Sequence, residues 1–243
     1  MPEKGYVDIH THIIPGVDDG SKNIEESVRM LEIAYNQGIR TIYATPHYGS
    51  GKERYDRDYL TGQYELLKEK ALGIGDGGIE LLLGNEIYYR NGTIDELKSG
   101  QALTMNNTKY VLVEFNVDIA YKDLYSALQK LVLAGYRPIL AHIERYFCLM
   151  KKFDLLYAIK NLGVCMQINA SSVIPKINSE ASFCRKAIRE GYISFLGSDC
   201  HRTEWRPPCM ADAVRVLTKK TPEKIIDRIL YKNPVKLYNN EFI

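Results

Sequence analysis

The sequence predicts an α/β fold in which short buried strands alternate with helices. Two observations favour it. A unit of helix, glycine, apolar strand and polar residue recurs along the chain, and no low-complexity linker interrupts it. Such alternation indicates a parallel sheet. About seven strands in one unit indicate an irregular α/β barrel, so we expect a single domain over residues 1–243.

The first expected strand begins at Tyr6 and ends at His10 and His12. Residues two apart in an extended chain point to the same side, so both imidazoles can face one point. Asp18 and Asp19 follow after a Pro-Gly turn. Two histidines and a carboxylate at a strand end indicate a metal site. Two solvent-facing histidines at a sheet edge would give the same pattern.

The next unit begins with a helix start at Ser21–Glu26, where carboxylates occupy the first turn, and Gly38 marks the helix end. The apolar segment Thr41–Ala44 then leads to His47. Further strands are expected at Ile79–Glu86, at Tyr110–Glu114, and in the segments that lead to His142, Asn169 and Asp199. Helices are expected between them, at Asp56–Leu72, Tyr121–Ala134, Asp154–Leu162, Ser179–Glu190 and after Thr221.

Composition excludes several classes of protein. The formal net charge is only +2, which gives no nucleic-acid footprint. No apolar run approaches the roughly 20 residues of a membrane-spanning helix, so we expect no direct membrane insertion. The N-terminal residues lack a secretory signal. The five cysteines are odd in number and form no CxxC pair, which indicates a reduced, cytoplasmic protein.

The ionisable residues fall at or just after the ends of expected strands. This holds for all five histidines and for three acids, namely His10, His12, His47, His142, His201, Glu86, Glu114 and Asp199. In an α/β barrel these strand ends share one face, which carries the active site. The alternative is a set of unrelated histidines, each satisfied locally, which would have to reach one rim by chance.

Glu86 and Glu114 each end a run that should be buried, and an unpaired carboxylate there would be costly. A cation removes that cost, and an Arg or Lys partner is the alternative. The candidate ligands outnumber the needs of one ion, which favours two or three ions that share carboxylates. Nitrogen and oxygen donors without sulfur favour Mn, Fe or Zn.

Clustered ions are suited to phosphoester hydrolysis, because they supply hydroxide and neutralise phosphate oxygens. We expect this hydroxide to attack phosphorus in line, without a phosphoenzyme. Arg145 and Arg206 lie close after His142 and His201, and arginines bind phosphate oxygens in bidentate fashion. Arg202 is a weaker candidate. The alternative for each arginine is a salt bridge at the rim.

Cys200 and Arg206 have the Cys-x5-Arg spacing of cysteine-based tyrosine phosphatases. Those enzymes wrap phosphate in a glycine-bearing loop. Here the intervening loop has no glycine, carries Glu204, and overlaps the Asp199-x-His201 pair. We therefore expect a metal mechanism and not a cysteine nucleophile.

Together these motifs resemble the polymerase-and-histidinol-phosphatase superfamily of metal-dependent phosphoesterases. The pattern consists of His-x-His12, Thr-Pro-His47, Ala-His142 and Asp-x-His201. The chain is more closely similar to the bacterial tyrosine-protein phosphatases of capsule and exopolysaccharide clusters. That similarity rests on Val-Asp-Asp-Gly20, Ala-His-Ile-Glu-Arg-Tyr146 and Arg206-Pro-Pro208.

The resemblance implies a distorted (β/α)7 TIM-like barrel with a trinuclear, manganese-preferring site at the C-terminal ends of the strands. It implies Asp19 as the ligand of the two aspartates, and phosphate binding by Arg145 and Arg206. The implied ligands are His10, His12, Asp19, His47, Glu86, Glu114, His142, Asp199 and His201.

The implied activity is that of a phosphoric monoester hydrolase, a protein-tyrosine phosphatase. The implied substrate is the phosphotyrosine tail of a bacterial tyrosine kinase that controls polysaccharide export. Two alternatives stay open. One is another phosphoesterase of the superfamily, such as a histidinol-phosphate phosphatase, and the other is a catalytically silent metal-binding regulatory module.

Overall fold

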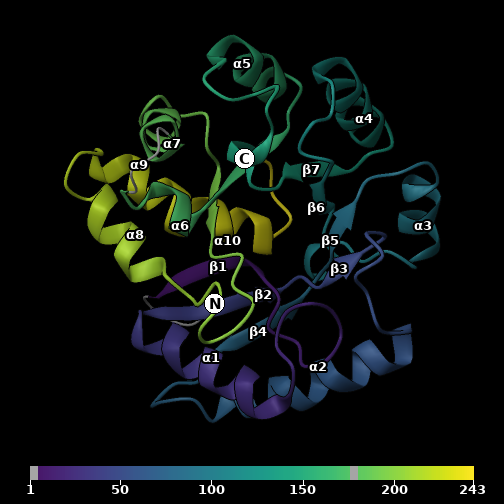
Figure 1. The fold of residues 1–243 in the computed structure, drawn as a ribbon, viewed down its shortest axis with the longest axis vertical. Helices are drawn as coiled ribbons and strands as arrows, with labels where there is room; N and C mark the ends of the chain where they lie inside the picture. The colour runs from purple at the N-terminus through teal and green to yellow at the C-terminus, as the bar shows by residue number, and fades with distance from the viewer. Residues whose placement is uncertain (1–4, 176–179) are drawn as a thin grey trace.

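A curled parallel sheet with helices on its outer side forms the centre of the computed structural model, which describes residues 5–175 and 180–243 (Figure 1). The strands of these ranges are β1 (Tyr6–Thr11), β2 (Ile39–Ala44), β3 (His47–Tyr48), β4 (Glu80–Leu83), β5 (Glu86–Tyr88), β6 (Tyr110–Glu114), β7 (Arg137–Leu140), β8 (Cys165–Asn169) and β9 (Phe195–Gly197).

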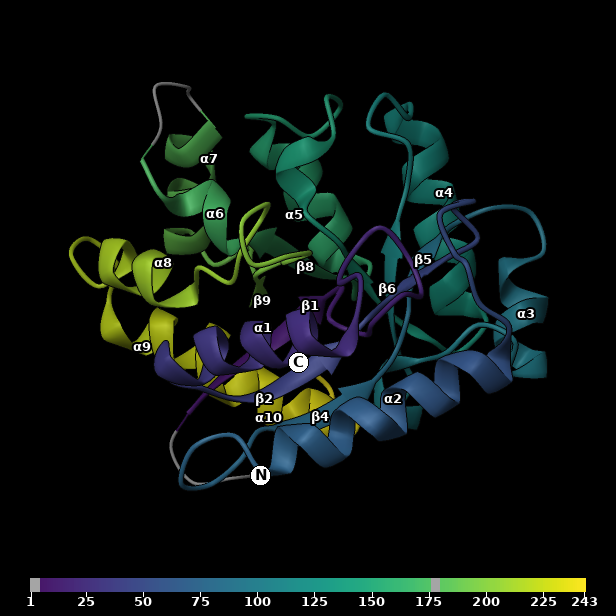
Figure 2. The same ribbon diagram turned by 60° about the horizontal axis from the view of Figure 1, so that its bottom comes forward.

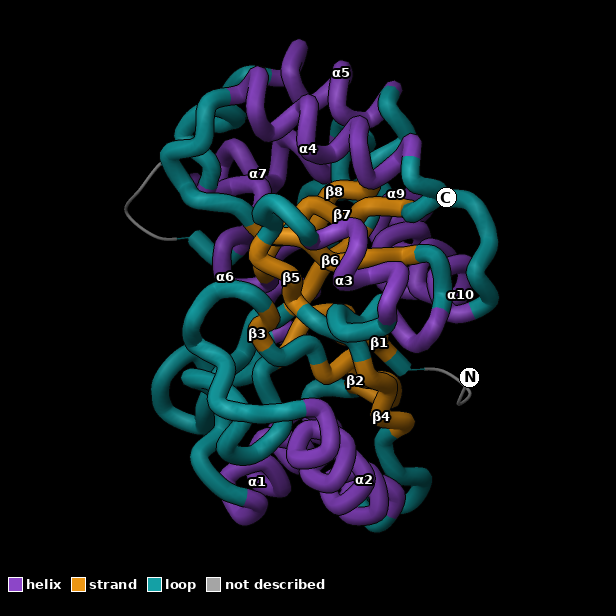
Figure 3. The backbone as a smooth tube through the Cα atoms, turned by 90° about the vertical axis from the view of Figure 1, so that its right-hand side faces the viewer, coloured by secondary structure: helices purple, strands orange, loops and turns teal. Residues whose placement is uncertain are grey.

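The α-helices of the same ranges are α1 (Ile24–Asn36), α2 (Arg57–Leu72), α3 (Thr93–Ser99), α4 (Tyr121–Leu133), α5 (Phe153–Asn161), α6 (Ala170–Val173), α7 (Glu180–Arg189), α8 (Met210–Leu217), α9 (Glu223–Asp227) and α10 (Asn233–Tyr238). Helices α1 and α2 lie on the outer side of the sheet at one end of the molecule, and α4 and α5 lie at the opposite end (Figures 1 and 3). No helix within the described ranges has the length and apolar character needed to cross a membrane.

All strand pairs are parallel, in the orders β1-β2-β4 and β3-β5-β6-β7-β8-β9. The curl brings β1 beside the segment that follows β9. The backbone N–H of Asp199 donates to His10 O over 2.8 Å, and that of His12 donates to Cys200 O over 2.9 Å. The first and last strands therefore deliver their ligand residues to the same place.

Helix α1 begins as its sequence predicts. Asn23 is the N-cap, and its side chain accepts a hydrogen bond from the Glu26 N–H over 2.9 Å. Glu26 Oε2 in turn accepts from the Lys22 N–H over 2.9 Å. The first bond satisfies a backbone donor that the first helical turn leaves unpaired, and the second ties the residue before the cap to the helix.

The other predicted helices are confirmed within one or two residues, as α2, α4, α5 and α7. Ser179, the predicted start of α7, lies outside the described residues. Three short helices were not predicted, namely α3, α6 and α8. Each of these has eight residues or fewer, which is too short for a clear periodic pattern of apolar residues.

The prediction of one strand over Ile79–Glu86 is wrong, because the chain breaks between β4 and β5. Asn85 holds the break: its Nδ2 donates to Pro46 O over 3.1 Å, and its Oδ1 accepts from the Leu103 N–H over 2.9 Å. Glu86 consequently begins a strand where the sequence predicted that it ends one. His47 likewise begins β3 after a gap in the pairing of β2.

Strand β1 has a register shift just before its ligand residues. Asp8 pairs with Ile42 and Thr11 with Ala44, so three steps along β1 match two along β2. An extra residue of this kind changes the direction in which side chains point. Apolar residues pack beneath the ligands: Leu237 of α10 shares a buried cluster with Val7 of β1 and other strand residues. Helix α10 lies under the sheet in Figure 2.

Candidate metal centre

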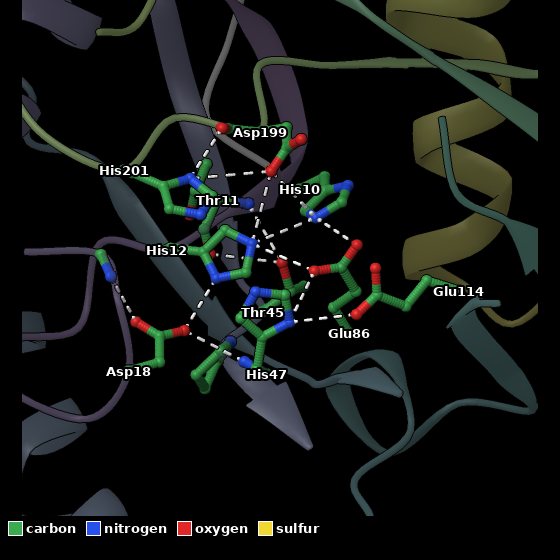
Figure 4. A network of polar contacts seen from close by, with 12 residues as sticks. His10, Thr11, His12, Asp18, Thr45, His47, Glu86, Glu114, Asp199 and His201 are labelled. Carbon is green, nitrogen blue, oxygen red and sulfur yellow. Dashed lines mark hydrogen bonds and ion pairs between the residues drawn. The ribbon is translucent and has the colours of Figure 1, made fainter. Parts of the chain in front are cut away.

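The five histidines gather near the C-terminal ends of β1, β7 and β9. Figure 4 shows His10, His12, His47 and His201. The ring centroid of His12 lies 4.1 Å from that of His201 and 4.4 Å from that of His47. The centroids of His10 and His142 are 5.7 Å apart. All five rings are buried. They come from four segments of the chain that are distant in sequence, because His10 and His12 share one segment.

The predicted acids complete this cluster. Ligand atoms within 4.8 Å of one another form three groups in the described part of the chain: His12, Asp19, His47 and His201; His10, His12 and Glu86; and His47, Glu86 and Glu114. These groups share members, and Glu86 connects the second to the third. Such overlap is expected where one carboxylate serves two ions.

The remaining two predicted ligands border the same groups. His142 Nε2 lies 2.8 Å from Glu86 Oε1, and Asp199 Oδ1 lies 3.4 Å from His12 Nε2. The structure therefore brings together every residue that the sequence predicts as a ligand. His47 and Glu86 are among them although each begins a strand, where the sequence analysis expected each at a strand end.

The contacts within the cluster fit a set of cation ligands. Nε2 of His10 and Nε2 of His12 face each other at 3.3 Å, and each lies 3.2 Å from an oxygen of Glu86. Two imidazole nitrogens in this position need a proton or a cation between them. Nitrogen and carboxylate oxygen donors are the ligands that Mn, Fe and Zn accept.

Three buried atoms of the cluster have no hydrogen-bond partner among the described residues, namely Asp19 Oδ1, His47 Nδ1 and His142 Nδ1. His47 Nδ1 does lie 3.0 Å from Glu86 Oε2, as a charge contact. Buried polar atoms are nearly always bonded. These unpaired atoms are consistent with a site that binds cations.

The charges of the cluster also suit cation binding. Burial raises the pKa of Glu86, but His10 and His47 outweigh it, so this pKa lies well below its usual range. Burial and the neighbouring His12 lower the pKa of His201 to about 4. Metal ligands must be ionised carboxylates and neutral imidazoles, and Glu86 and His201 are already in those forms near neutral pH.

Asp18 lies behind His12, and the sequence analysis did not assign it this role. Its Oδ2 accepts from His12 Nδ1 over 2.7 Å and from the His47 N–H over 3.0 Å. Burial raises the pKa of Asp18, but the neighbouring His12 outweighs burial and lowers this pKa to about 2. A carboxylate bonded to Nδ1 fixes the ring and leaves Nε2 for a cation. The structure thus separates the two aspartates: Asp19 faces the cluster, and Asp18 orients a ligand.

Two amide side chains of β8 support the ligands on the other side of the cluster, and the sequence analysis assigned them no role. Gln167 Oε1 accepts from the His142 N–H over 2.7 Å and lies 3.3 Å from His10 Nδ1. Gln167 Nε2 donates to Asn169 Oδ1 over 2.9 Å, and Asn169 Nδ2 donates to Asp199 Oδ2 over 2.8 Å. The sequence did contain a signal for this role, because Gln167 and Asn169 are two residues apart at the end of a strand.

Three of the predicted site residues have left-handed backbone conformations, with φ of 33° at His142, 53° at Asp199 and 55° at Arg206. Such conformations cost non-glycine residues on the order of 1–3 kcal/mol each and are concentrated at functional sites. Hydrogen bonds from the His142 N–H to Gln167 and from the Asp199 N–H to His10 hold two of them in place.

The chain is similar to known proteins over most of its length. The family model for capsular polysaccharide synthesis proteins, CpsB/CapC, matches residues 6–239. The chain belongs to this family. It is 32% identical over 243 residues to the tyrosine-protein phosphatase CpsB of Streptococcus agalactiae serotype V, covering 98% of this chain and 100% of the relative. It is 30% identical over 238 residues to the tyrosine-protein phosphatase YwqE of Bacillus subtilis strain 168, covering 98% and 93%.

A solved structure supports the fold of this family member. It comes from crystal structures of YwqE from Bacillus subtilis and CpsB from Streptococcus pneumoniae, which are described as unique metal-dependent tyrosine phosphatases. It superposes with a TM-score of 0.87 at 30% identity, covering 98% of this chain and 96% of the other. The resemblance inferred from the sequence motifs is confirmed.

Arg145 and Arg206 both reach the cluster. Arg145 Nη2 lies 2.5 Å from Asp199 Oδ2, and Arg206 contacts the same oxygen. Arg206 Nη1 also lies 3.1 Å from His201 Nε2. These contacts are the salt bridges that the sequence analysis weighed against phosphate binding. A guanidinium has five donors, and both side chains are partly exposed, so each has donors left for an anion.

Cys200 is buried and is not placed as a nucleophile. Its side chain is 2% exposed, and burial raises the pKa of the thiol well above its usual value. A cysteine reacts as the thiolate, which this environment disfavours. The guanidinium of Arg206 binds Asp199. The structure therefore agrees with the expectation that the Cys-x5-Arg spacing in this family member is coincidental.

Proposed function

We propose that this protein is a metal-dependent protein-tyrosine phosphatase. The observation that carries the proposal is the gathering of nine imidazole and carboxylate side chains at one place, with two guanidiniums beside them. Relatives over the full chain are named tyrosine-protein phosphatases, and a similar solved structure is described as metal-dependent. The substrate would be phosphotyrosine in a protein.

Two or three divalent ions would be held by the nine side chains. The three overlapping groups of ligand atoms support more than one ion. Manganese is the metal that the family resemblance implies, with Fe or Zn as alternatives, and the nitrogen and oxygen donors fit all three. The proposed ligands are His10, His12, Asp19, His47, Glu86, Glu114, His142, Asp199 and His201.

The ions, when bound, would lower the pKa of a water and supply hydroxide for in-line attack on phosphorus. Arg145 and Arg206 would donate hydrogen bonds to phosphoryl oxygens, where negative charge must be stabilised. Asp18 would keep His12 oriented throughout. The leaving phenolate has a pKa near 10, so it needs a general acid less than an alkoxide does, and we assign none.

We further propose that the curled sheet is a distorted (β/α)7 TIM-like barrel within one domain, residues 1–243, with the ligands at its C-terminal rim. Strand β2 leads into β3, and β4 into β5, so the nine strands of the described ranges correspond to seven positions in the barrel. The hydrogen bonds from β1 to the segment after β9 support closure of the barrel.

The family model is one of capsular polysaccharide synthesis. We therefore propose that the physiological substrate is the phosphotyrosine segment of a bacterial tyrosine kinase that regulates capsule or exopolysaccharide synthesis. A cytoplasmic location is the matching prediction, since such a substrate is made where ATP is available.

Phosphate release from a phosphotyrosine peptide, measured with added Mn, tests the proposal. We expect turnover that EDTA abolishes and that Mn restores. Faster release from histidinol phosphate would assign the chain to another phosphoesterase activity. Protein that binds metal but releases no phosphate, even from p-nitrophenyl phosphate, would indicate a silent regulatory module.

A further inference from the structure

A lysine reaches the cluster from a loop whose sequence gave no functional signal. Lys52 Nζ lies 3.1 Å from Asp19 Oδ2 and 3.0 Å from His47 Nε2. The Lys52 side chain is 47% exposed. Its ammonium group therefore lies between solvent and two of the proposed metal ligands.

The backbone on the C-terminal side of Lys52 is tied to the site. The Arg54 N–H donates to Val17 O over 2.7 Å, which joins this loop to the segment that carries Asp19. The Tyr55 hydroxyl donates to His47 O over 2.7 Å. These bonds hold the backbone that follows Lys52 close to the cluster.

The preceding part of the loop is also ordered. Glu53 Oε1 accepts from the Gly49 N–H over 2.9 Å, and Glu53 Oε2 accepts from the Ser50 hydroxyl over 3.3 Å. Gly49 and Gly51 both have φ of 80°, a conformation that favours glycine. A loop of this kind presents the lysine in a defined direction.

Lys52 approaches the cluster from a different side than the two arginines. The arginines contact Asp199, whereas Lys52 contacts Asp19. His201 lies between these carboxylates, with Nε2 3.5 Å from Asp19 Oδ1 and Nδ1 3.7 Å from Asp199 Oδ1. Three partly exposed cationic side chains thus contact acids of the cluster, two at Asp199 and one at Asp19.

The contacts of Lys52 conflict with bound cations. An ammonium ion and a divalent ion cannot both bind Asp19 and His47 Nε2 without strong repulsion. Ion binding would release the lysine. Its flexible side chain and three N–H donors would then be available to bind an anion. An exposed ion pair contributes little stability by itself, so stability alone does not explain why the loop is built this way.

We propose that Lys52 is a third phosphate-binding residue, which donates to a phosphoryl oxygen of the substrate once the cluster holds its ions. This inference rests on the proposed phosphatase function. A phosphomonoester carries between one and two negative charges near pH 7 and presents three terminal acceptor oxygens. Two planar guanidiniums and one compact ammonium match that charge and geometry.

The test compares Lys52→Met, Lys52→Arg and a matched control, Lys186→Met. Lys186 is similarly exposed, at 51%, and has one carboxylate partner, Glu190, at 3.6 Å. Each Mn-loaded protein is assayed for metal content, for binding of inorganic phosphate by calorimetry, and for KM and kcat on a phosphotyrosine peptide.

We expect Lys52→Met to keep its metal, to bind phosphate about tenfold more weakly and to raise KM by a similar factor, as for loss of one charged hydrogen bond. Lys52→Arg should recover most of the phosphate affinity, and Lys186→Met should match the wild type. Unchanged phosphate affinity in Lys52→Met would overturn the inference, and so would loss of metal from it.

These outcomes are distinct from failure of the proposed function. Wild-type protein that binds phosphate through Lys52 but hydrolyses no phosphotyrosine would support the binding role and contradict the phosphatase proposal. If the wild-type protein hydrolyses phosphotyrosine and Lys52→Met equals it in KM and phosphate affinity, the phosphatase proposal is supported and the binding role of Lys52 is contradicted.

Discussion

The ring of His12 is held on two sides. Its Nδ1 donates to Asp18, and its Nε2 faces His10 and Glu86. An imidazole oriented in this way presents one nitrogen to a cation without losing rotational freedom on binding. At the scale of residues, the site therefore depends on the ligands and on the neighbours that fix their direction.

Asp18→Asn should weaken metal binding without removing a ligand. The amide accepts a hydrogen bond from Nδ1 less strongly than the carboxylate does, so the orientation of His12 is less secure. Loss of an outer partner typically costs about 10–100-fold in metal affinity. Titration of metal-free protein with Mn measures the effect, and Asn at the exposed Asp76 is the control. Equal affinities for both variants would show that Asp18 has no such role.

His142→Ala and Cys200→Ser separate the metal mechanism from the cysteine mechanism. His142 Nε2 lies 2.8 Å from Glu86 Oε1 in the cluster, so its removal should lower metal content and reduce turnover by at least about 100-fold. Cys200→Ser should keep most of the activity, because the buried thiol is protonated. Turnover lost in the serine variant and kept in the alanine variant would reverse the assignment.

At the scale of elements, interruptions of regular structure place the ligands. The break between β4 and β5 moves Glu86 into the cluster. Close approach of β9 to β1 needs a residue without a side chain at Gly197. A Cβ there would lie 2.7 Å from His10 Cβ and 3.1 Å from Gln167 Nε2. The strand pair and the ligand orientation are therefore linked.

Gly197→Ala should lower both the free energy of unfolding and the metal affinity. Overpacking of this kind costs about 1–3 kcal/mol, and here the displaced atoms belong to His10 and Gln167. Gly62→Ala in α2 is the control, because a Cβ there meets nothing within 4 Å. It should stabilise the protein by about 0.5–1 kcal/mol.

Urea unfolding and Mn titration of both variants measure these changes. A Gly197→Ala protein as stable as the wild type would show that the two strands can separate without affecting the site.

At the scale of the whole molecule, the curl of the sheet concentrates charge in a buried volume. Ion pairs between histidines and carboxylates partly balance that charge. Burial lowers the pKa of His47, but the neighbouring carboxylates of Glu86, Asp19 and Glu114 outweigh it and raise the pKa to about 10. Between pH 6.5 and about 10, the metal-free fold thus keeps a proton on His47 that the unfolded chain loses.

This linkage has a sign that thermal unfolding can test. The pKa of His47 is raised from 6.5 to about 10 in the metal-free fold. Its contribution to the stability of the metal-free protein is therefore full below pH 6.5 and is lost as the pH rises toward 10. Metal binding displaces protons and strengthens with pH. The Tm difference between Mn-loaded and EDTA-treated protein should therefore widen as pH rises from 6.5 to 10. A difference independent of pH would contradict this account.

The sequence by itself determined the kinds of residue that form the site and most of the helices. His-x-His12, Asp-x-His201 and the arginines beside His142 and His201 were recognised because their chemistry and spacing are local. The start of α1 was recognised because its cap lies within a few residues of the helix. Local patterns of this kind need no knowledge of distant contacts.

Only the tertiary structure decided how these parts meet. Asn85 breaks a strand because Pro46 and Leu103 lie beside it. Asp18 is distinguished from Asp19 by its bond to the distant His47 N–H as well as to His12, and Lys52 reaches the cluster through a loop attached at Val17. Each of these depends on segments far apart in the chain, whose approach is set by packing of the whole sheet and not by any local preference.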